Sequence, residues 1–382
     1  MPAAIRVLHV ATGNLYGGVE VFLHTLARPG GAGETAAEFT VCWGGGRLAK
    51  ELRATGAQVH DLGEVRLSRP WQIFRARRRL AEVLQGRPPE VAVLHSGWTH
   101  AVFGPVFRRY RIPLVMGVHT VVPQGSRLER WARRIPLNAV FANSRFTAAS
   151  AHGWYPGCAE PEVLYLPVEA PTAVPAPIRA ELRRQLGAQP EDCVILQASR
   201  LQPLKGQKTL LMALVALKAQ PGWRCWLAGG AQRSEEEAWL AELRTFVLEQ
   251  GLGDRVTFLG QRDDVPALLA AADVVCQVNA EPEAFGLIYV EALAAGKPVI
   301  AANQGGVTEV VDSSCGALLP PGASEALAGV LREWVGDPSL RSRLGAAGRA
   351  RAAARCDVRR QIEALNGFLE RAREGYKKKS GG

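Results

Sequence analysis

The chain has 382 residues, of which 47% are hydrophobic and 21% charged, and its formal net charge is +10 at pH 7. This length is too great for one ordinary hydrophobic core, so two domains are expected. No apolar run reaches the roughly 18 residues that a membrane-spanning helix needs. The first residues, MPAAIRVLHVATGN, also lack the pattern of a signal peptide. The sequence therefore predicts a globular protein that stays in the cytoplasm.

The positive charge lies mainly in residues 1–170, in the arginine-rich runs RARRRL, RRYR and RLERWARR, which would attract anionic surfaces. No recognised nucleic-acid module accompanies this charge, so nucleic acid is not an expected partner. Trp71, Phe74, Leu80 and Leu84 have helical spacing, which favours a face packed on the N-terminal core. The alternative is a basic and aromatic surface that makes peripheral contact with an anionic membrane.

Short apolar runs alternate with helix-length segments along the whole chain, a pattern typical of parallel sheets with crossover helices. In the first half the expected strands are IRVLHVA, FTVCW, VAVLH, PLVMGVH and AVFAN. In the second half they are VILQAS, RCWLAG, RVTFLG, DVVCQV and PVIAA. Each half is therefore predicted to form a doubly wound, Rossmann-like α/β domain, and the two domains to face one another across a ligand-binding cleft.

Proline-rich PVEAPTAVPAPI suits neither a helix nor a central strand, and it is the predicted linker between the domains. We expect an N-terminal domain over residues 1–170 and a C-terminal domain over 171–355. Residues 356–374 have helical spacing and are expected to pack back near the N-terminal domain, followed by a charged, disordered tail over 375–382.

The first glycine-rich loop lies in ATGNLYGGVEVFLHTLA, between the first expected strand and the first expected helix. It lacks the third glycine of the G-x-G-x-x-G fingerprint, so a dinucleotide site is not indicated. The adjacent Gly17 and Gly18 would still allow the backbone to approach a phosphate or a sugar closely. A plain tight turn explains the same residues almost equally well.

The loop in VILQASRLQPLKGQKTLLMALVAL follows an expected strand and precedes an expected helix. Arg200 and Lys205 would lie at the carboxyl end of the strand, with Gly206 at the mouth of the helix. Two cations and unpaired backbone N–H groups suit a diphosphate. An ordinary basic loop is the alternative for this segment taken alone.

The stretch EAFGLIYVEALAAGKPVI places Glu291 within a helix that is otherwise almost wholly apolar, expected to start at Leu287 and to end at Gly296. Burying an unpaired carboxylate is costly, so Glu291 needs hydrogen-bond donors. The paired hydroxyls of a ribose would supply them, and an arginine from another helix would do so equally well. Glu283 would lie at the rim of the helix, where a carboxylate can accept from two sugar hydroxyls.

SRLQPLKG followed by EAFGLIYVEALAAGKPVIAANQGGVTEVV resembles glycosyltransferase family 4, a group of retaining enzymes with the GT-B fold. Glu283 and Glu291 have the spacing of the family's E-x7-E motif. GGVEVFLHTLA is similar to its first glycine loop, PLVMGVH to its histidine-bearing strand end, and VTFLGQRDDVPALLAAADV to its base-binding region. The chain departs from the family's common pattern at Ala284, where proline is frequent.

The resemblance implies roles for particular residues. Arg200 and Lys205 would hold the donor diphosphate and stabilise it as a leaving group. Glu283 would bind sugar hydroxyls and Glu291 the ribose, while His119 would face the transferred sugar. The remaining implied donor-site residues are Gly17, Gly18, Leu259, Arg262, Ala284, Phe285, Gly286 and Leu287.

Three further residues follow another N-terminal strand in LHSGWTH, and His95, Trp98 and His100 are expected on the acceptor side. Asp263 and Asp264 are adjacent and suit a helix N-terminus better than a metal pair, so no metal and no cofactor are expected. The seven cysteines are scattered without paired spacing and suit reduced structural thiols.

The favoured function is transfer of a hexosyl unit from a nucleotide diphosphate sugar, with a UDP-sugar preferred, to a hydroxyl of a glycan, glycolipid or small molecule. One alternative is a sugar-nucleotide epimerase or hydrolase, which would need a dedicated acid and base. The other is a non-catalytic protein that binds anionic surfaces.

Overall fold

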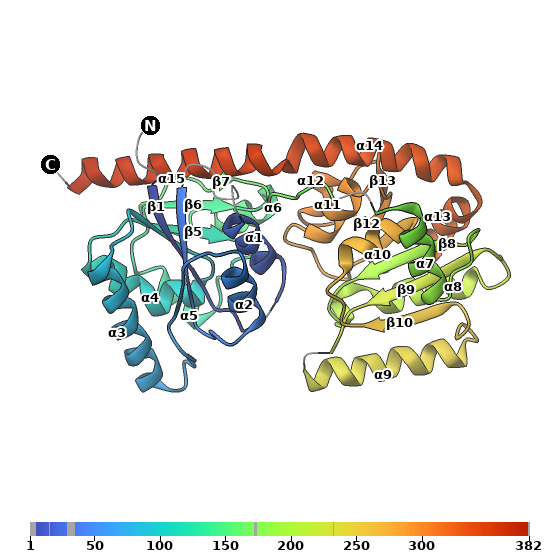
Figure 1. Cartoon of the computed structure of the whole chain (residues 1–382), viewed down its shortest axis with the longest axis horizontal. Coiled ribbons are helices and arrows are strands. Elements are labelled where there is room, and N and C mark those ends of the chain that lie inside the picture. The colour runs from blue at the N-terminus through green and yellow to red at the C-terminus, as the bar shows by residue number, and fades with distance from the viewer. Residues whose placement is uncertain (1–4, 15, 29–34, 172–173, 232, 381–382) are drawn as a thin grey trace. The chain divides into compact units, whose positions relative to one another are not determined.

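The computed structural model describes residues 5–14, 16–28, 35–171, 174–231 and 233–380 (Figure 1). The chain divides into two compact units, each with its own sheet and hydrophobic core. Unit 1 comprises Met1–Pro167 and Val358–Gly382, and unit 2 comprises Val168–Asp357. The sequence placed these divisions after residue 170 and before residue 356. The predicted linker spans the first division, and its residues 172–173 lie outside the described residues.

Unit 1 has a parallel sheet whose described strands have the order β3-β2-β1-β4-β5-β6-β7. The strands are β1 (Ile5–Ala11), β2 (Thr35–Val41), β3 (Val59–Asp61), β4 (Val91–Leu94), β5 (Leu114–Val118), β6 (Ala139–Ala142) and β7 (Glu162–Val163). The helices are α1 (Gly18–Ala27), α2 (Arg47–Ala54), α3 (Pro70–Gly86), α4 (Gly97–Arg109), α5 (Arg127–Ala132), α6 (Arg145–Ala151) and α15 (Val358–Ser380). The order reverses between β1 and β4, and ligands of open α/β sheets bind at such a switch point.

Unit 2 repeats this doubly wound arrangement, with the described strands in the order β10-β9-β8-β11-β12-β13. The strands are β8 (Cys193–Ala198), β9 (Trp223–Ala228), β10 (Val256–Gly260), β11 (Val274–Gln277), β12 (Val299–Ala302) and β13 (Gly316–Leu319). The helices are α7 (Ala176–Gln185), η1 (Pro203–Lys205), α8 (Gln207–Ala216), α9 (Ser234–Glu249), α10 (Val265–Ala271), α11 (Leu287–Ala294), α12 (Val307–Val310), α13 (Ser324–Gly336) and α14 (Pro338–Cys356). Here the order reverses between β8 and β11, so the loops after these two strands meet at the switch point.

The strands predicted from sequence are all present, and the two-domain Rossmann-like fold is confirmed. The predicted tail differs from the structure, because α15 continues through Ser380 instead of ending near residue 374. Lys377 and Lys378 lie in its last turns, where positive charge interacts favourably with the helix dipole. Residues 381–382 lie outside the described residues.

Helix α3 buries only part of the face that its sequence predicted to be buried. Leu80 and Leu84 are buried in the core of unit 1, as expected. Trp71 and Phe74 are instead 56% and 72% exposed, so the predicted packing of these two rings on the core is wrong. The helix starts at Pro70, and Gln72 and Ala76 occupy the buried positions of its first two turns, which turns both rings outward.

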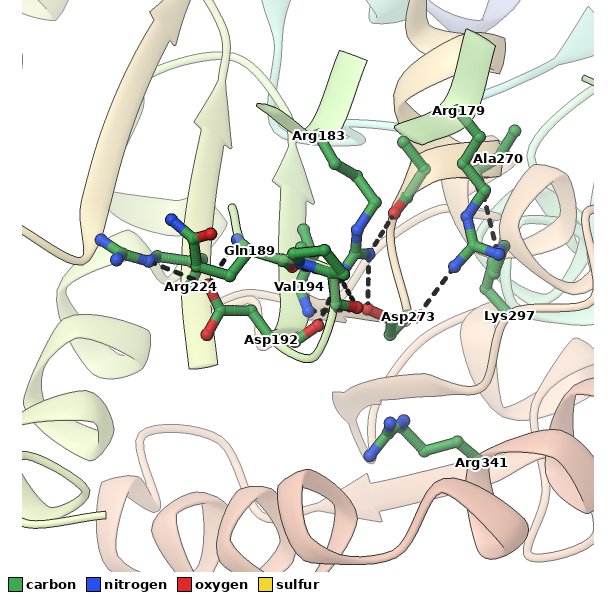
Figure 2. A network of polar contacts seen from close by, with 12 residues as sticks. Arg179, Arg183, Gln189, Asp192, Val194, Arg224, Ala270, Asp273, Lys297 and Arg341 are labelled. Carbon is green, nitrogen blue, oxygen red and sulfur yellow. Dashed lines mark hydrogen bonds and ion pairs between the residues drawn. The ribbon is translucent and has the colours of Figure 1, made fainter. Parts of the chain in front are cut away.

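A polar network ties α7 to the strands β8 and β11 of unit 2, as Figure 2 shows. The side chain of Arg183 is only 8% exposed, and its Nη1 lies 2.8 Å from Asp273 Oδ2. Arg179 donates to the other carboxylate oxygen over 3.2 Å, and the backbone N–H of Val194 donates to Oδ2 over 2.8 Å. Arg183 also donates to the carbonyls of Ala271 and Asp192. The guanidinium and the carboxylate are thus both compensated within the fold.

We predict that Arg183→Met destabilises unit 2 by about 3–5 kcal/mol, because it removes one partner of a buried ion pair. The neighbouring Arg184→Met is the matched control, since Arg184 is exposed and its described ion pair is with Glu181 on the surface. Differential scanning calorimetry of both variants measures the effect. Equal unfolding temperatures for the two variants would contradict the structural role of Arg183.

Candidate donor site and histidine row

Lys205 is held at the carboxyl end of β8 by close backbone packing. It ends the short helix η1, and Gly206 follows it with φ of 74°, a left-handed conformation that favours glycine. A Cβ at Gly206 would collide with the carbonyl of Val278, just beyond β11. The Lys205 carbonyl accepts a 2.7 Å hydrogen bond from Gln197 Nε2. The loop that carries Lys205 is therefore fixed against both strands of the switch point.

The structure brings Lys205 and Glu283 into direct contact. Lys205 Nζ lies 2.5 Å from Glu283 Oε2, with side chains only 14% and 20% exposed. Asn279 Nδ2 donates to the same oxygen over 2.8 Å. Burial alone would raise the pKa of Glu283, but the charge and hydrogen bonds of Lys205 and Asn279 outweigh it and hold that pKa below its usual value. Glu283 is thus an ionised carboxylate locked beside an ammonium group.

The adjacent glycines Gly305 and Gly306 support Glu283 from the loop after β12. The backbone N–H of Gly306 donates to the Glu283 carbonyl over 2.8 Å, and Glu283 and Gly305 form an isolated parallel bridge. Gly305 has φ of 75°, and a Cβ at Gly306 would collide with the Ala284 carbonyl. Asn279, Gly305 and Gly306 were not among the predicted site residues. The adjacent glycines of NQGGV were the available signal for the last two.

Helix α11 begins at Leu287 as predicted, after Gly286 with φ of 82°. Ala284 and Phe285 connect Glu283 to this start, and the Phe285 side chain is fully buried. The Gly286 position is restricted because a Cβ there would collide with the Tyr289 ring. The start of α11, where the first N–H groups of a helix lack an i−4 partner within the helix, therefore lies close to Glu283 in the chain.

Glu291 lies one turn into α11 and is partly buried. Within the part of the chain that the structure describes, its carboxylate makes no hydrogen bond or ion pair, so the arginine partner considered from sequence is not found. Burial raises the pKa of Glu291 to about 7. The missing donors for this carboxylate are therefore not supplied by the described residues.

Arg200 is exposed at the start of the same loop as Lys205. Among the described contacts its guanidinium has no acidic partner, while its carbonyl accepts from Gln207 Nε2 over 2.9 Å. Its neighbour Leu201 is buried and anchors the loop. Arg200 is consequently a cation that remains available to an anionic ligand.

Arg262 and Leu259 lie at the carboxyl end of β10. Arg262 forms a two-pronged ion pair with Asp264, with Nε to Oδ1 at 2.7 Å and Nη2 to Oδ2 at 2.5 Å. This pair holds the pKa of Asp264 below its usual value through the hydrogen bonds from Arg262. Asp264 precedes α10, in agreement with the helix-terminal position predicted for Asp263 and Asp264.

In unit 1, Gly17 precedes α1 and Gly18 is its first residue. Both glycines are exposed. Gly17 has φ of −167°, which any residue can adopt, so the backbone conformation does not require glycine at this position. The absence of a side chain would instead allow a ligand to approach the backbone closely. Leu15, in the same loop, lies outside the described residues.

His119 and His95 follow β5 and β4 and belong to a hydrogen-bonded row with His9 of β1. His9 Nδ1 lies 3.0 Å from His95 Nε2, and His95 Nδ1 lies 2.9 Å from His119 Nε2. All three side chains are buried. His9 was not among the predicted residues, because within IRVLHVA it reads as an ordinary strand residue.

The other two residues predicted on the acceptor side occupy different environments. Trp98 is partly buried and packs near Trp43 and Phe103. His100 is fully buried, and its Nε2 lies 3.0 Å from the Ile135 carbonyl. This environment suits a structural histidine, because its Nε2 is bonded to a backbone carbonyl within the core of unit 1.

Comparison with known proteins identifies the family to which the chain belongs. Residues 178–351 match the family model described as glycosyl transferases group 1, and residues 16–170 match that of Glycosyltransferase Family 4. The two matches together cover most of the chain, and its two Rossmann-like sheets are typical of the GT-B fold. The chain belongs to glycosyltransferase family 4.

Two relatives and one solved structure illustrate the similarity. The chain is 35% identical to a D-inositol 3-phosphate glycosyltransferase of Jonesia denitrificans, over 67% of this chain and 64% of the relative. It is 36% identical to a GDP-mannose-dependent alpha-(1-6)-phosphatidylinositol monomannoside mannosyltransferase of Mycobacterium tuberculosis, over 45% of each chain. The chain thus spans less than two thirds of the length of these curated relatives. The crystal structure of Anabaena Alr3699/HepE with UDP-glucose superposes with a TM-score of 0.84 at 26% identity, over 96% of this chain and 99% of that one.

We predict that Glu291→Gln stabilises the ligand-free protein at pH 8. Because the folded-state pKa is raised from 4.5 to about 7, the native state binds the extra proton between these values, and stability falls as the pH rises through about 7. The penalty is on the order of 3 kcal/mol above that pH. The amide should therefore raise the unfolding temperature at pH 8 and have little effect at pH 4.5.

Thermal unfolding measured at half-unit steps from pH 4.5 to 8.5 tests this dependence. The exposed Glu333→Gln on α13 is the control that changes the same charge at the surface. A Glu291→Gln curve that runs parallel to that of the control would show that burial of Glu291 carries no penalty.

Proposed function

We propose that the protein is a retaining, metal-independent glycosyltransferase that moves a hexosyl unit from a UDP-sugar to a hydroxyl of a glycan, a glycolipid or a small molecule. The observation that carries the proposal is the polar arrangement at the β8–β11 switch point. There the Arg200 guanidinium and the Glu291 carboxylate, which have no ionic partner among the described residues, lie in the same domain as the Lys205–Glu283 pair. This domain matches the glycosyl transferases group 1 model.

The chemistry of transfer suits these charges. Cleavage of the anomeric bond leaves negative charge on the diphosphate, and fixed cations aimed at that charge lower the barrier. Arg200 and Lys205 would provide them without a metal ion. Lys205 has three N–H donors, so it can retain Glu283 while donating to a phosphate oxygen. Glu283 would accept from sugar hydroxyls, and the ribose would supply the donors that Glu291 lacks.

The engagement of Glu283 favours same-face attack over a covalent enzyme intermediate as the route to retention. A carboxylate that is already bonded to Lys205 and Asn279 is a poor nucleophile. Attack of the acceptor on the same face as the departing diphosphate, with the diphosphate taking the acceptor's proton, needs no enzyme nucleophile. The product's anomeric configuration, read by proton NMR, tests the retaining assignment, and an inverted product would overturn it.

The donor and the acceptor are proposed from similarity together with the site. A structural neighbour that matches nearly the whole chain binds UDP-glucose, which favours a UDP-sugar. Two relatives carry names that specify GDP-mannose or inositol-containing acceptors, so GDP-mannose is the competing donor. A screen of both donors, first for hydrolysis and then for transfer to inositol phosphates and to lipid extracts, separates these possibilities.

The surface of α3 supports a peripheral position on the cytoplasmic face of the membrane. Trp71 and Phe74 are exposed beside Arg75, Arg78 and Arg79, and the guanidinium carbon of Arg75 lies 5.1 Å from the Trp71 ring centroid. Rings that insert at the headgroup level, next to arginines that attract anionic lipid, are typical of interfacial helices. No helix of the described chain has both the length and the apolarity to cross a bilayer.

We predict that Arg200→Ala and Lys205→Ala each lower kcat by roughly 10²–10³-fold, because each removes a cation that stabilises the leaving group. Lys208→Ala on α8 is the matched control; Lys208 pairs with Glu242 and lies over the Phe246 ring. Single-turnover assays with the active donor measure the effect, and EDTA should leave the wild-type rate unchanged. Full turnover in the Arg200→Ala, Lys205→Ala double variant would overturn the proposed function.

We predict that Trp71→Ala with Phe74→Ala reduces binding to phosphatidylglycerol-containing vesicles about tenfold, because two rings leave the bilayer interface. Leu248→Ala is the control, since Leu248 is 73% exposed on α9 of unit 2. Vesicle co-sedimentation measures binding. Equal binding of the double variant and the control would show that α3 does not contact the membrane through these two rings.

A further inference from the structure

His9, His95 and His119 of unit 1 form a hydrogen-bonded row in which the middle ring, His95, bonds to each neighbour through a different nitrogen. The contacts run from His9 Nδ1 to His95 Nε2 and from His95 Nδ1 to His119 Nε2. The His9 ring stacks on Phe39 at one end, and Phe22 and Phe141 pack against His119 at the other. The hydrogen-bonded histidines are thus enclosed by aromatic rings.

The three rings are neutral, so each carries one proton. Burial lowers the pKa of His9 to about 3 and that of His119 to about 4, with the neighbouring His119 adding to the effect on His9. Burial and the other two rings lower the pKa of His95 well below its usual value. With one proton per ring, each hydrogen bond needs one donor and one acceptor, and the tautomers of all three rings are coupled.

Only two proton arrangements satisfy both hydrogen bonds. In the first, His119 Nε2–H donates to His95, and His95 Nε2–H donates to His9, which leaves His119 Nδ1 as an acceptor. In the second, both bonds are reversed, and His119 Nδ1 carries a proton. His119 Nδ1 is buried and has no hydrogen-bond partner among the described residues. Because a buried N–H without a partner is costlier than an unused lone pair, the first arrangement is favoured.

We propose that His9 and His95 are positioning residues that hold His119 in the Nε2–H tautomer, so that its Nδ1 presents a hydrogen-bond acceptor to a hydroxyl of the transferred sugar. The tautomer itself follows from the row and from the surroundings of His119 Nδ1, and it does not depend on any substrate. Its use on a sugar rests on the proposed function, with His119 as the residue that faces the donor sugar. A sugar hydroxyl can donate to an acceptor at this position and so satisfy the buried nitrogen.

Nitrogen-15 NMR of the full chain with labelled histidine tests the tautomer without any substrate. The sequence has seven histidines, so single substitutions suffice to assign their signals. In the wild-type protein, His119 Nδ1 should show the shift of an unprotonated ring nitrogen and Nε2 that of a protonated one. The opposite assignment would overturn the proposal.

Substitution of the middle ring tests whether the row sets this tautomer. His95→Phe keeps an aromatic ring but removes both hydrogen bonds, and His119 should then show a mixture of tautomers. His95→Asn can still accept from His119 Nε2–H and should restore the single tautomer. His100→Phe removes a buried histidine outside the row and should leave the His119 signals unchanged. An unchanged His119 in His95→Phe would contradict the positioning role.

Turnover separates this inference from the proposed function. His95→Phe should lower kcat about tenfold, the value of one lost hydrogen bond, with the donor KM within about twofold. His95→Asn should recover most of that rate. If the His95→Phe rate equals that of the wild type while Lys205→Ala is inactive, the proposed function stands and the use of His119 on the sugar fails. If the wild type transfers no sugar, the proposed function fails, and the NMR result still decides the tautomer.

Discussion

The buried ion pair between Lys205 and Glu283 is the contact on which the site of unit 2 depends. Each charge alone would be costly at its depth, and the short distance between them compensates both. The pair also joins the loops after β8 and β11, the two strands at which the sheet order reverses. Gly206, Gly305 and Gly306 are required around it because backbone carbonyls occupy the space that a Cβ would need. The ligand-free domain thus holds its polar groups in position before a ligand arrives, which reduces the cost of ordering them on binding.

Glu291, which lies in α11, shows the opposite situation. Its carboxylate is partly buried and has no partner among the described residues, and its raised pKa reflects the cost of that burial. A sequence under selection for stability alone would place an apolar residue or a glutamine in α11. Unfavourable burial of a polar group is found most often at functional sites, where a ligand completes the interaction. The two carboxylates therefore differ in how they are compensated. Glu283 is held by hydrogen bonds within the protein, whereas Glu291 has no hydrogen-bond donor among the described residues.

The sequence predicted the long, buried elements well and the short ones poorly. Runs such as IRVLHVA and VILQAS are apolar enough to mark central strands. The edge strands β3 and β7 have three and two residues, which gives no periodic pattern to detect. The exposure of Trp71 could not be predicted either. Helical spacing shows which side chains share a face, but it does not show whether that face packs on the core or lies in solvent. Register and edge position are tertiary properties, and composition does not encode them locally.

The same limit applies to the site. Motif spacing located Lys205 and Glu283, but their mutual contact depends on the adjacency of β8 and β11, which is a property of the sheet order. The histidine row was hidden for the same reason, because His9 lies within β1 and His95 and His119 follow β4 and β5, which are distant from one another in sequence. The two units consequently offer different chemistry at their carboxyl edges. Unit 2 presents charges that suit a diphosphate, whereas unit 1 presents neutral imidazoles that can bond hydroxyls without adding charge. Its excess of arginine lies elsewhere, as in the exposed Arg75, Arg78 and Arg79 of α3, so attraction to an anionic surface does not compete with the hydrogen-bonding role of the row.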